Sequence, residues 1–198
     1  MSYNYITIER EYGSGGAIIA DRLSKDCGIP CYGQQIFEKV SQELRMSVDQ
    51  IENREEKVTN SFLYSMYMLA TMRSGSGDML TAEKKIFLSA QKAVQDFAAK
   101  GSCIFVGHCA SEGLKDRKDV LRVFIRSDYE HKKQRAISEY GIPEADVDRT
   151  MRHYDKRRSS FFYDNTSKRW DSMESYDLIL DSGSMGIDSC VQILKSLL

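Results

Sequence analysis

The chain alternates between short runs of β-branched and aromatic residues and longer stretches in which apolar residues recur every three to four positions. The short runs predict strands at residues 3–8, 103–106, 121–125 and 177–180. The longer stretches predict helices between them, with regular examples at 34–44 and 81–100. Because strands alternate with helices, we expect an α/β fold with a mostly parallel sheet covered on both faces.

Local signals predict where several of these elements end. The first strand is expected to end before Glu9, and Gly28 is a typical stop for the helix that precedes it. Ser47-Val48-Asp49-Gln50 has the pattern of a capping box and predicts a helix start. Residues 143–163 predict one long polar helix that starts at a proline and ends or bends near Ser159-Ser160.

The segment between these helices has a composition of its own. Residues 61–72 are rich in Tyr, Met, Phe and Leu, and they are followed by Ser74-Gly75-Ser76-Gly77. This pattern predicts a helical subregion followed by a flexible tip. The apolar stripe of the helix is expected to pack against other parts of the chain, and a subunit contact in a homodimer is the alternative.

Composition and charge exclude several classes of protein. A length of 198 residues, of which 41% are hydrophobic and only two are proline, predicts one folded domain. A net charge of −1 provides no basic field to attract nucleic acid or an anionic membrane. No apolar run approaches about 18 residues and no secretory signal opens the chain, so we expect a cytoplasmic protein. Five scattered cysteines and three histidines indicate neither disulfides nor a metal site.

A glycine-rich loop, residues 13–16, joins the first predicted strand to the first predicted helix. Such loops bind phosphates because successive backbone N–H groups converge at a helix N-terminus. Compared with G-x-x-x-x-G-K-[ST], Gly15 holds the last glycine position, Arg10 the first, Gly16 the lysine and Ala17 the hydroxyl position. Without lysine and hydroxyl, the loop supports anion binding better than phosphoryl transfer. The alternative is a turn whose glycines serve only close packing.

A second signal is a basic block between residues 149 and 169. Seven Lys and Arg residues against two Asp give it a net charge of +5. Arg152, Lys156 and Ser159 share a helical face, and guanidinium groups suit phosphate oxygens, so the block could clamp a triphosphate. The alternative is a solvated helix face whose cations pair with neighbouring carboxylates.

Two further features lie at the predicted sheet edge and after it. His108 follows a buried strand and Gly107, so we expect it at the carboxyl edge of the sheet, where open α/β folds bind ligands. It could contact a base or phosphate there, or serve as a structural hydrogen-bond donor. The aromatic residues are expected to pack in the core rather than to stack on a base; they are Phe161, Phe162, Tyr163, Trp170 and Tyr176.

Four segments together resemble the cytidylate kinase-like family of P-loop proteins. They are Ile6-Thr7-Ile8-Glu9-Arg10-Glu11-Tyr12-Gly13-Ser14-Gly15-Gly16, Ile104-Phe105-Val106-Gly107-His108-Cys109-Ala110, Asp155-Lys156-Arg157-Arg158 and Tyr176-Asp177-Leu178-Ile179-Leu180-Asp181. The resemblance spans nearly the whole chain and is most specific in the R-E-[FY]-G-S-G-G opening and the D-K-x-R block.

The resemblance implies a three-layer P-loop NTPase-type fold with a mostly parallel five-stranded sheet. It implies one domain over 1–198, with a helical monophosphate-binding subregion at 45–81 and a basic lid-like segment at 143–170. ATP and Mg²⁺ are the implied cofactors. The donor phosphates would lie on Gly13, Ser14, Gly15, Gly16 and Ala17. Asp155 and Arg158 would hold the acceptor, and Arg152 and Arg157 would be lid arginines on the transferring group. Apart from the resemblance, we expect His108 to contact the acceptor, and Arg10 to join the lid arginines, Arg158 included, in supplying the charge of the absent lysine.

The function expected from this resemblance is transfer of the γ-phosphoryl group of ATP to CMP or a related small phosphate acceptor. The alternative is a catalytically weak or inactive nucleotide-binding protein, because His108 stands where the family usually has arginine and Ala17 where relatives often have a polar or basic side chain. A third hypothesis, an interaction protein without nucleotide affinity, depends on the stripe at 61–72.

Overall fold

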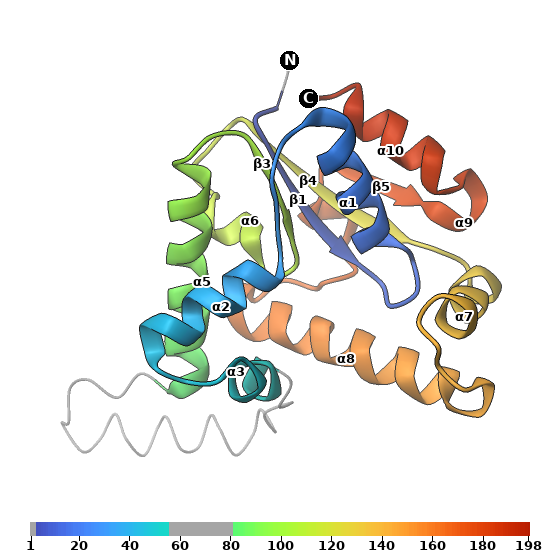
Figure 1. The fold of residues 1–198 in the computed structure, drawn as a ribbon, viewed down its shortest axis with the longest axis horizontal. Coiled ribbons are helices and arrows are strands. Elements are labelled where there is room, and N and C mark those ends of the chain that lie inside the picture. Colours follow the sequence, from blue (N-terminus) through green and yellow to red (C-terminus); the bar gives the residue numbers. More distant parts are fainter. Residues whose placement is uncertain (1–2, 56–80) are drawn as a thin grey trace.

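A computed structural model describes residues 3–55 and 81–198 of the chain. Its centre is a five-stranded sheet of order β2-β3-β1-β4-β5 in which every pairing is parallel (Figure 1). The strands are β1 (Tyr5–Arg10), β2 (Cys31–Tyr32), β3 (Cys103–Val106), β4 (Val120–Arg126) and β5 (Leu178–Asp181). The expected α/β class and the parallel five-stranded sheet are confirmed.

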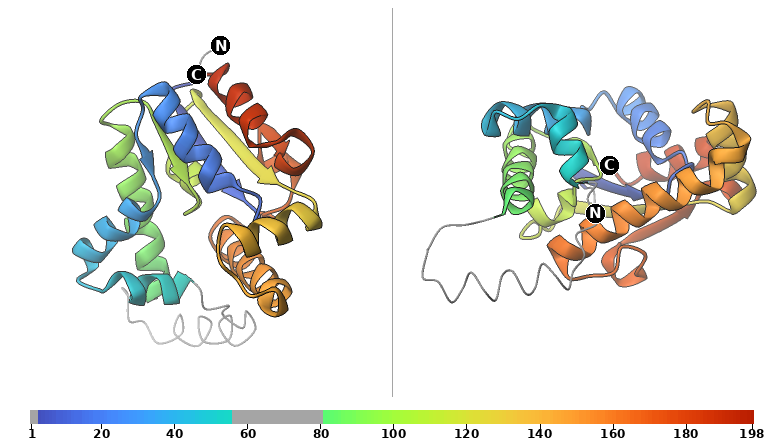
Figure 2. Two further views of the ribbon diagram at one scale, coloured as in Figure 1. Left: turned by 45° about the vertical axis from the view of Figure 1, so that its right-hand side comes forward. Right: turned by 90° about the horizontal axis from the view of Figure 1, so that it is seen from below.

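Helices cover both faces of the sheet, as Figure 2 shows. One face packs against α1 (Gly16–Cys27) and α10 (Ile187–Lys195), and the core there includes Ile6 and Ile8 of β1. The other face packs against α2 (Gln34–Leu44) and α5 (Ala82–Ala98), with α3 (Val48–Glu55) beside them. Tyr5 belongs to this second core, because successive strand residues point to opposite faces. Both faces of the strands are therefore apolar, as expected for a parallel sheet.

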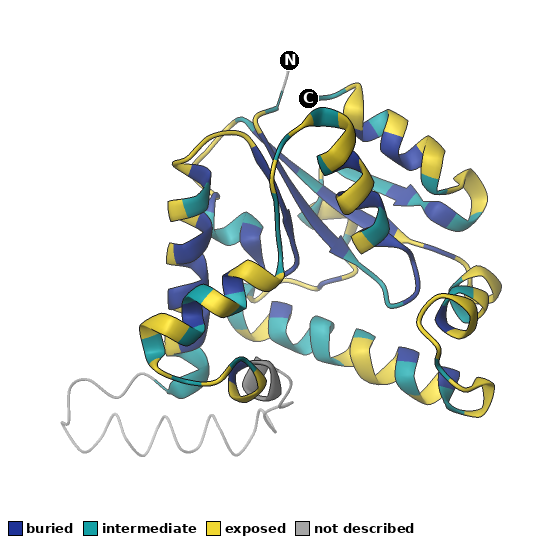
Figure 3. Cartoon of the chain, viewed as in Figure 1, coloured by how far each residue is buried: buried dark blue, intermediate teal, exposed yellow. Residues whose placement is uncertain are grey.

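Helix α8 (Val147–Thr166) crosses below the carboxyl ends of the strands in Figure 1. The predicted helix start at Pro143 was wrong, because residues 144–146 form a separate 3₁₀ turn. The helix does not end near Ser159-Ser160 either, because it continues to Thr166. Buried Phe162 anchors the helix directly after the two serines, and this packing outweighs their weak helix preference. Figure 3 shows the resulting mixture of buried and exposed positions along α8.

Two of the local signals, the stop at Gly28 and the capping box at Ser47, are confirmed. Gly28 ends α1 in a left-handed conformation, with its N–H donating to the Ser24 carbonyl. The capping box forms reciprocally: Ser47 N donates to Gln50 Oε1 at 3.0 Å, and Gln50 N donates to Ser47 Oγ at 3.2 Å. The remaining helical elements are α6 (Ala110–Gly113), α7 (Tyr129–Ser138), α9 (Ser182–Met185), and the 3₁₀ turns Glu144–Asp146 and Met173–Ser175.

The carboxyl end of β1 lies further along the chain than the sequence predicted, and this position matters for the site. The strand does not end before Glu9: Glu9 and Arg10 pair with Phe124 and Ile125 of β4. Glu9 is buried, so a carboxylate and a guanidinium stand at the carboxyl end of a central strand.

Some expectations fall outside the described residues, namely the helix at 61–72, the tip at 74–77, and most of the subregion at 45–81. Among the helices that are described, none has the length and apolar character needed to cross a membrane.

Candidate functional site

The glycine loop follows β1 and leads into α1. Gly13 and Gly15 have φ values of +80° and +76°, and Gly15 is the N-cap of α1, without a side-chain cap. The buried Ser14 hydroxyl donates to the Glu11 carbonyl at 2.9 Å, which fixes the turn from inside. The first backbone N–H groups of α1 are therefore not capped by a side chain, as in helix N-termini that bind anions.

Close packing leaves little room for a side chain at three of the loop positions. A Cβ on Gly16 would lie 2.6 Å from Arg10 Cβ, and one on Gly15 would lie 2.6 Å from Ile187 Cδ1. A Cβ on Gly13 would lie 2.8 Å from the Lys132 carbonyl oxygen. The glycines are thus explained by packing alone. The case for anion binding therefore depends on the groups around the loop.

Three distant segments hold the backbone of this loop. Tyr12 N donates to Asp155 Oδ1 of α8 at 2.6 Å. The Arg135 guanidinium of α7 donates to the Gly13 carbonyl, and Ser182 Oγ at the start of α9 donates to the Ser14 carbonyl at 2.6 Å. The loop is therefore the meeting point of the first helix with α7, α8 and α9.

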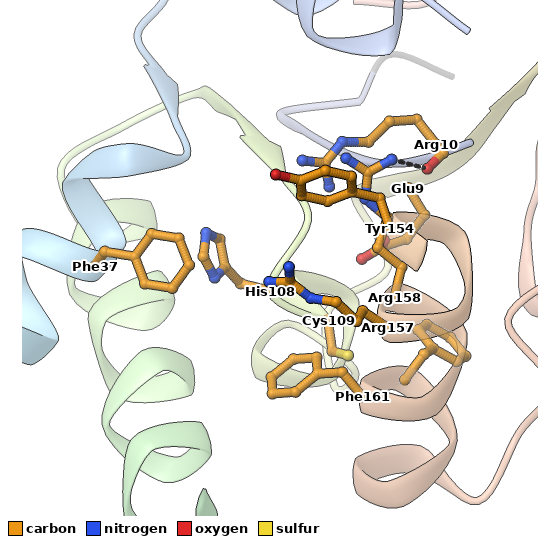
Figure 4. Close-up of a pocket in the computed structure, with 10 residues that line it drawn as sticks. Glu9, Arg10, Phe37, His108, Cys109, Tyr154, Arg157, Arg158 and Phe161 are labelled. Atoms are coloured by element: carbon orange, nitrogen blue, oxygen red, sulfur yellow. Dashed lines mark hydrogen bonds between the residues drawn. The ribbon is translucent and has the colours of Figure 1, made fainter. Parts of the chain in front are cut away.

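A pocket of about 280 Å³ opens beside the loop, between the carboxyl ends of β1 and β3 and helices α2 and α8 (Figure 4). Its lining residues are Glu9, Arg10, Phe37, His108, Cys109, Tyr154, Arg157, Arg158, Phe161 and Phe162. The lining combines three guanidinium groups with several aromatic rings. Such a set can pair with an anion through the guanidiniums and pack against a flat ring.

Two of the cations lie together at the end of β1. Arg158 Nη1 donates to the Arg10 carbonyl at 3.0 Å, drawn as the dashed line in Figure 4. Burial, followed by the positive charge of Arg10, lowers the pKa of Arg158 to about 10, so its guanidinium is still protonated at neutral pH. Asp155 Oδ1 is 3.8 Å from Arg158 Nη1. Neighbouring like charges with perturbed pKa values are characteristic of functional sites.

The turn after β3 is left-handed over three consecutive residues. Gly107, His108 and Cys109 have φ values of +77°, +60° and +49°. Left-handed backbone is costly for residues other than glycine, and such strain is concentrated at functional sites. Gln91 Nε2 of α5 donates to the His108 carbonyl at 2.9 Å and helps to hold the turn. The His108 ring meets Phe37 edge to face at 4.3 Å, at the sheet edge where the sequence predicted it.

A group of three tyrosines connects the loop to α8. The Tyr12 and Tyr154 rings are stacked with centroids 4.7 Å apart, and Tyr140 meets Tyr12 edge to face at 5.6 Å. Arg157 lies 5.0 Å from the Tyr154 ring centroid, and Arg158 lies 5.8 Å from that of Tyr12. Cation–π attraction thus holds Arg158 beside the glycine loop, and it holds Arg157 against Tyr154 on α8.

The structure brings only part of the predicted site together. Arg10, His108, Arg157 and Arg158 line the pocket, whereas Arg152 is exposed and does not. Asp155 is not a lining residue either, since its carboxylate accepts the Tyr12 N–H.

The basic block divides between its two interpretations. Arg149 pairs with Asp146, Lys168 with Glu112, and Arg169 with Asp171, as the solvated-face interpretation expects. Arg157 and Arg158 instead face the pocket. The interpretation as a clamp therefore concerns two members of the block.

Several lining residues were missed by the sequence analysis, namely Glu9, Phe37, Cys109 and Tyr154. Helical spacing could have found Tyr154, because it shares a face with Arg157, Arg158 and Phe161. Phe161 and Phe162 were expected in the core, and they both pack there and form a pocket wall. Nothing in the sequence pattern marks Phe37 or Cys109.

Within residues 3–55 and 81–198, no group of three or more His, Cys, Asp or Glu side chains is arranged to hold a metal ion. The Ser14 hydroxyl is engaged within the loop. Mg²⁺ in kinase sites is usually held by phosphate oxygens, water and one or two carboxylates, a mode that needs no such group.

A parallel sheet with a glycine loop after its first strand, and ligand-sized space at the carboxyl ends of β1 and β3, defines a P-loop kinase fold. Solved structures share it. An uncharacterized protein from Eubacterium ventriosum ATCC 27560 is 21% identical, with a TM-score of 0.71 over 97% of this chain and 96% of that one. Shikimate kinase from Bacteroides thetaiotaomicron is 11% identical, with a TM-score of 0.53 over 98% and 97% of the two chains.

The family follows from the sequence. The model of the cytidylate kinase-like family matches residues 5–184, and the chain belongs to this family. No curated protein shows significant sequence similarity to it.

Proposed function

We propose that this protein is a kinase that transfers the γ-phosphoryl group of ATP to CMP or a related small phosphate acceptor. The family and the P-loop kinase fold support a nucleotide kinase-like activity. The choice of a small phosphate acceptor depends on the cationic and aromatic lining of the pocket.

The position of Arg10 is the observation that carries the proposal. Arg10 ends β1, its Cβ packs where a side chain on Gly16 would lie, and its Nη1 lies over Gly107. One side chain that lines the pocket therefore extends from the start of α1 to the turn after β3. Phosphoryl transfer requires two anionic substrates to be aligned and their charge to be neutralised at such a junction.

The remaining groups have complementary roles in this proposal. The backbone of residues 13–17 would bind the donor phosphates, and ATP would bring Mg²⁺ on its own oxygens. The acceptor anion would bind to Arg157, Arg158 and His108. The ring of the acceptor would then lie beside Phe37.

Two predicted residues need a different role or a different state of the protein. Because Asp155 accepts the Tyr12 N–H, we assign it to the loop rather than to the acceptor. Exposed Arg152 reaches the transferring group only if the lid-like segment moves.

A second function, nucleotide binding without turnover, is favoured by two positions of the loop. Gly16 and Ala17 replace the lysine and hydroxyl of the P-loop motif. These side chains normally contact the transferring phosphate and Mg²⁺.

A coupled assay for ADP, run with ATP, Mg²⁺ and a panel of nucleoside monophosphates that includes CMP, tests the proposal. We expect acceptor-dependent ADP formation, and a fall in kcat/KM on the order of 10- to 100-fold in Arg158→Ala, because a charged hydrogen-bond donor is lost. Lys156→Ala is the matched control, since Lys156 is exposed on the same helix and does not line the pocket. It should stay within about twofold of the unmodified protein.

The assay also separates the two functions. ATP binding by calorimetry without ADP formation for any acceptor would establish the second function and refute the first. Equal turnover by Arg158→Ala and the unmodified protein would refute the assignment of Arg158.

A further inference from the structure

Helix α7 places a lysine beside the loop that lacks one. Gly16 stands where the P-loop motif has its lysine. Lys132 lies against the other end of the loop, where a Cβ on Gly13 would come within 2.8 Å of its carbonyl oxygen and 3.1 Å of its Cα. Figure 1 shows α7 next to the loop between β1 and α1. Lys132 is thus close in space to a loop from which it is 119 positions distant in sequence.

The ammonium group of Lys132 is held at the loop rather than in solvent. Lys132 Nζ is 3.0 Å from Glu11 Oε2, and the Lys132 side chain is only 14% exposed. The same carboxylate oxygen accepts Ser127 N at 3.1 Å, which fixes it at the junction of β4 and α7. Glu11 lies between β1 and the glycine loop, so the charge of Lys132 is anchored two positions before Gly13 in the sequence.

We propose that Lys132 supplies to the bound nucleotide the positive charge that the P-loop lysine would otherwise supply. An ammonium has three N–H donors on a flexible four-carbon stem, so it can contact a phosphate while it remains near Glu11. This inference rests on the proposed function, because it assigns a ligand of the donor phosphates. It explains how a loop with Gly16 and Ala17 can bind a triphosphate.

The competing explanation is that the Lys132–Glu11 pair only fastens α7 to the loop. The two explanations differ in what Glu11 does. If the ion pair only holds α7 against the loop, removal of either side chain loosens the loop to the same extent. If Lys132 serves the phosphates, Glu11 competes for its ammonium and repels the ligand, so the two losses act in opposite directions.

The test is the dissociation constant of ATP, measured by calorimetry for the full chain and for Lys132→Ala, Lys132→Arg, Glu11→Gln and Lys133→Ala. We expect Lys132→Ala to weaken ATP binding about tenfold or more, Lys132→Arg to recover most of the loss, and Glu11→Gln to bind ATP as well or better. Lys133 is the matched control, because it is the next residue on α7 and pairs with Glu144 at 2.9 Å, so Lys133→Ala should not change ATP affinity.

Inorganic tripolyphosphate is the second probe, since it carries the charge without the nucleoside. Lys132→Ala should weaken its binding by a similar factor. Equal losses of ATP affinity in Lys132→Ala and Glu11→Gln, or unchanged affinity in Lys132→Ala, would overturn the inference.

Failure of this inference and failure of the proposed function are distinguishable. A protein that binds ATP through Lys132 but phosphorylates no acceptor refutes the function alone. A protein that turns over normally as Lys132→Ala refutes the inference alone. An unmodified protein that binds neither ATP nor tripolyphosphate refutes both.

Discussion

At the scale of single residues, Asp155 has the most unusual surroundings among the carboxylates near the loop. It is partly buried, and this burial raises the pKa of its carboxyl group. The hydrogen bond from Tyr12 N–H and the positive charge of Arg158 lower the pKa, but burial outweighs them. Because the pKa is raised in the folded state, the stability that this group contributes is present at low pH and is lost as pH rises through the folded pKa. At neutral pH the ionised carboxylate is therefore a cost to folding.

Asp155→Asn is predicted to raise the resistance of the protein to urea at pH 7. The amide removes the buried charge and keeps an oxygen that can accept the Tyr12 N–H. The advantage should shrink toward zero as pH falls below about 3.9, where the unfolded carboxyl is also protonated. Asp155→Ala is the control, because it loses the acceptor and should gain nothing. Lower stability of Asp155→Asn at pH 7 would mean that Arg158 needs the negative charge more than burial opposes it.

Helical spacing alone singled out a face of α8 that does not line the pocket, whereas the family resemblance named Arg157 and Arg158, which do. Periodicity groups Arg152 with Lys156 and Ser159, and it equally groups Arg157 with Tyr154 and Phe161. Only the packing of the helix decides which group faces the sheet, and buried Met151 and Phe162 set that rotation. The motif residues Arg10 and His108 were found because their positions depend on strand ends rather than on helix rotation.

At the scale of elements, the left-handed turn after β3 determines where Arg10 can lie. A Cβ on Gly107 would fall against Arg10 Nη1, in a backbone conformation that already disfavours side chains. Gly28 provides a comparison, because its φ of +65° is similar and nothing lies within 4 Å of its added Cβ.

Gly107→Ala is predicted to destabilise the protein more than Gly28→Ala in urea unfolding. Both substitutions incur the left-handed penalty of about 1–2 kcal/mol. Gly107→Ala must also displace the Arg10 guanidinium, which is the far end of a flexible side chain, so its loss should be larger by about 0.5 kcal/mol. An equal loss of unfolding free energy in the two variants would show that Arg10 moves aside without cost. It would weaken the assignment of Arg10 to a fixed place in the pocket lining.

Long helices and strands could be predicted from the sequence, and very short ones could not. Helices α1, α2 and α5 span several turns and gave clear apolar repeats, and the capping box at Ser47 gave a correct start for α3. Strand β2 has two residues, too few to form an alternating pattern, so only the family resemblance implied a fifth strand. The start of α8 was misplaced because Pro143 suits a 3₁₀ turn as well as an α-helix.

At the scale of the whole molecule, the strand order explains the position of the pocket. The chain runs from β1 to β2 and β3 on one side, and then to β4 and β5 on the other. The connection after β1 runs to β2 on one side, whereas the connection after the neighbouring strand β3 runs past β1 to β4 on the other. Such a switch point between two adjacent strands opens a crevice at their carboxyl ends. The location of the pocket therefore follows from topology. Its aromatic wall depends on where α2 and α8 lie on either side of the pocket, which the sequence pattern does not encode.

The single tryptophan of the chain is joined directly to this crevice. Trp170 is buried, and its Nε1 donates to Glu9 Oε2 at 3.3 Å, while Glu9 stands in the pocket lining beside Arg10. An anion drawn to Arg10 changes the electric field at Glu9 and therefore at the indole. The molecule thus contains its own optical probe: CMP or another acceptor should shift or quench the intrinsic emission in a saturable titration, and Trp170→Phe should abolish the signal. If calorimetry detects binding of a ligand that leaves the emission unchanged, that ligand binds away from this crevice.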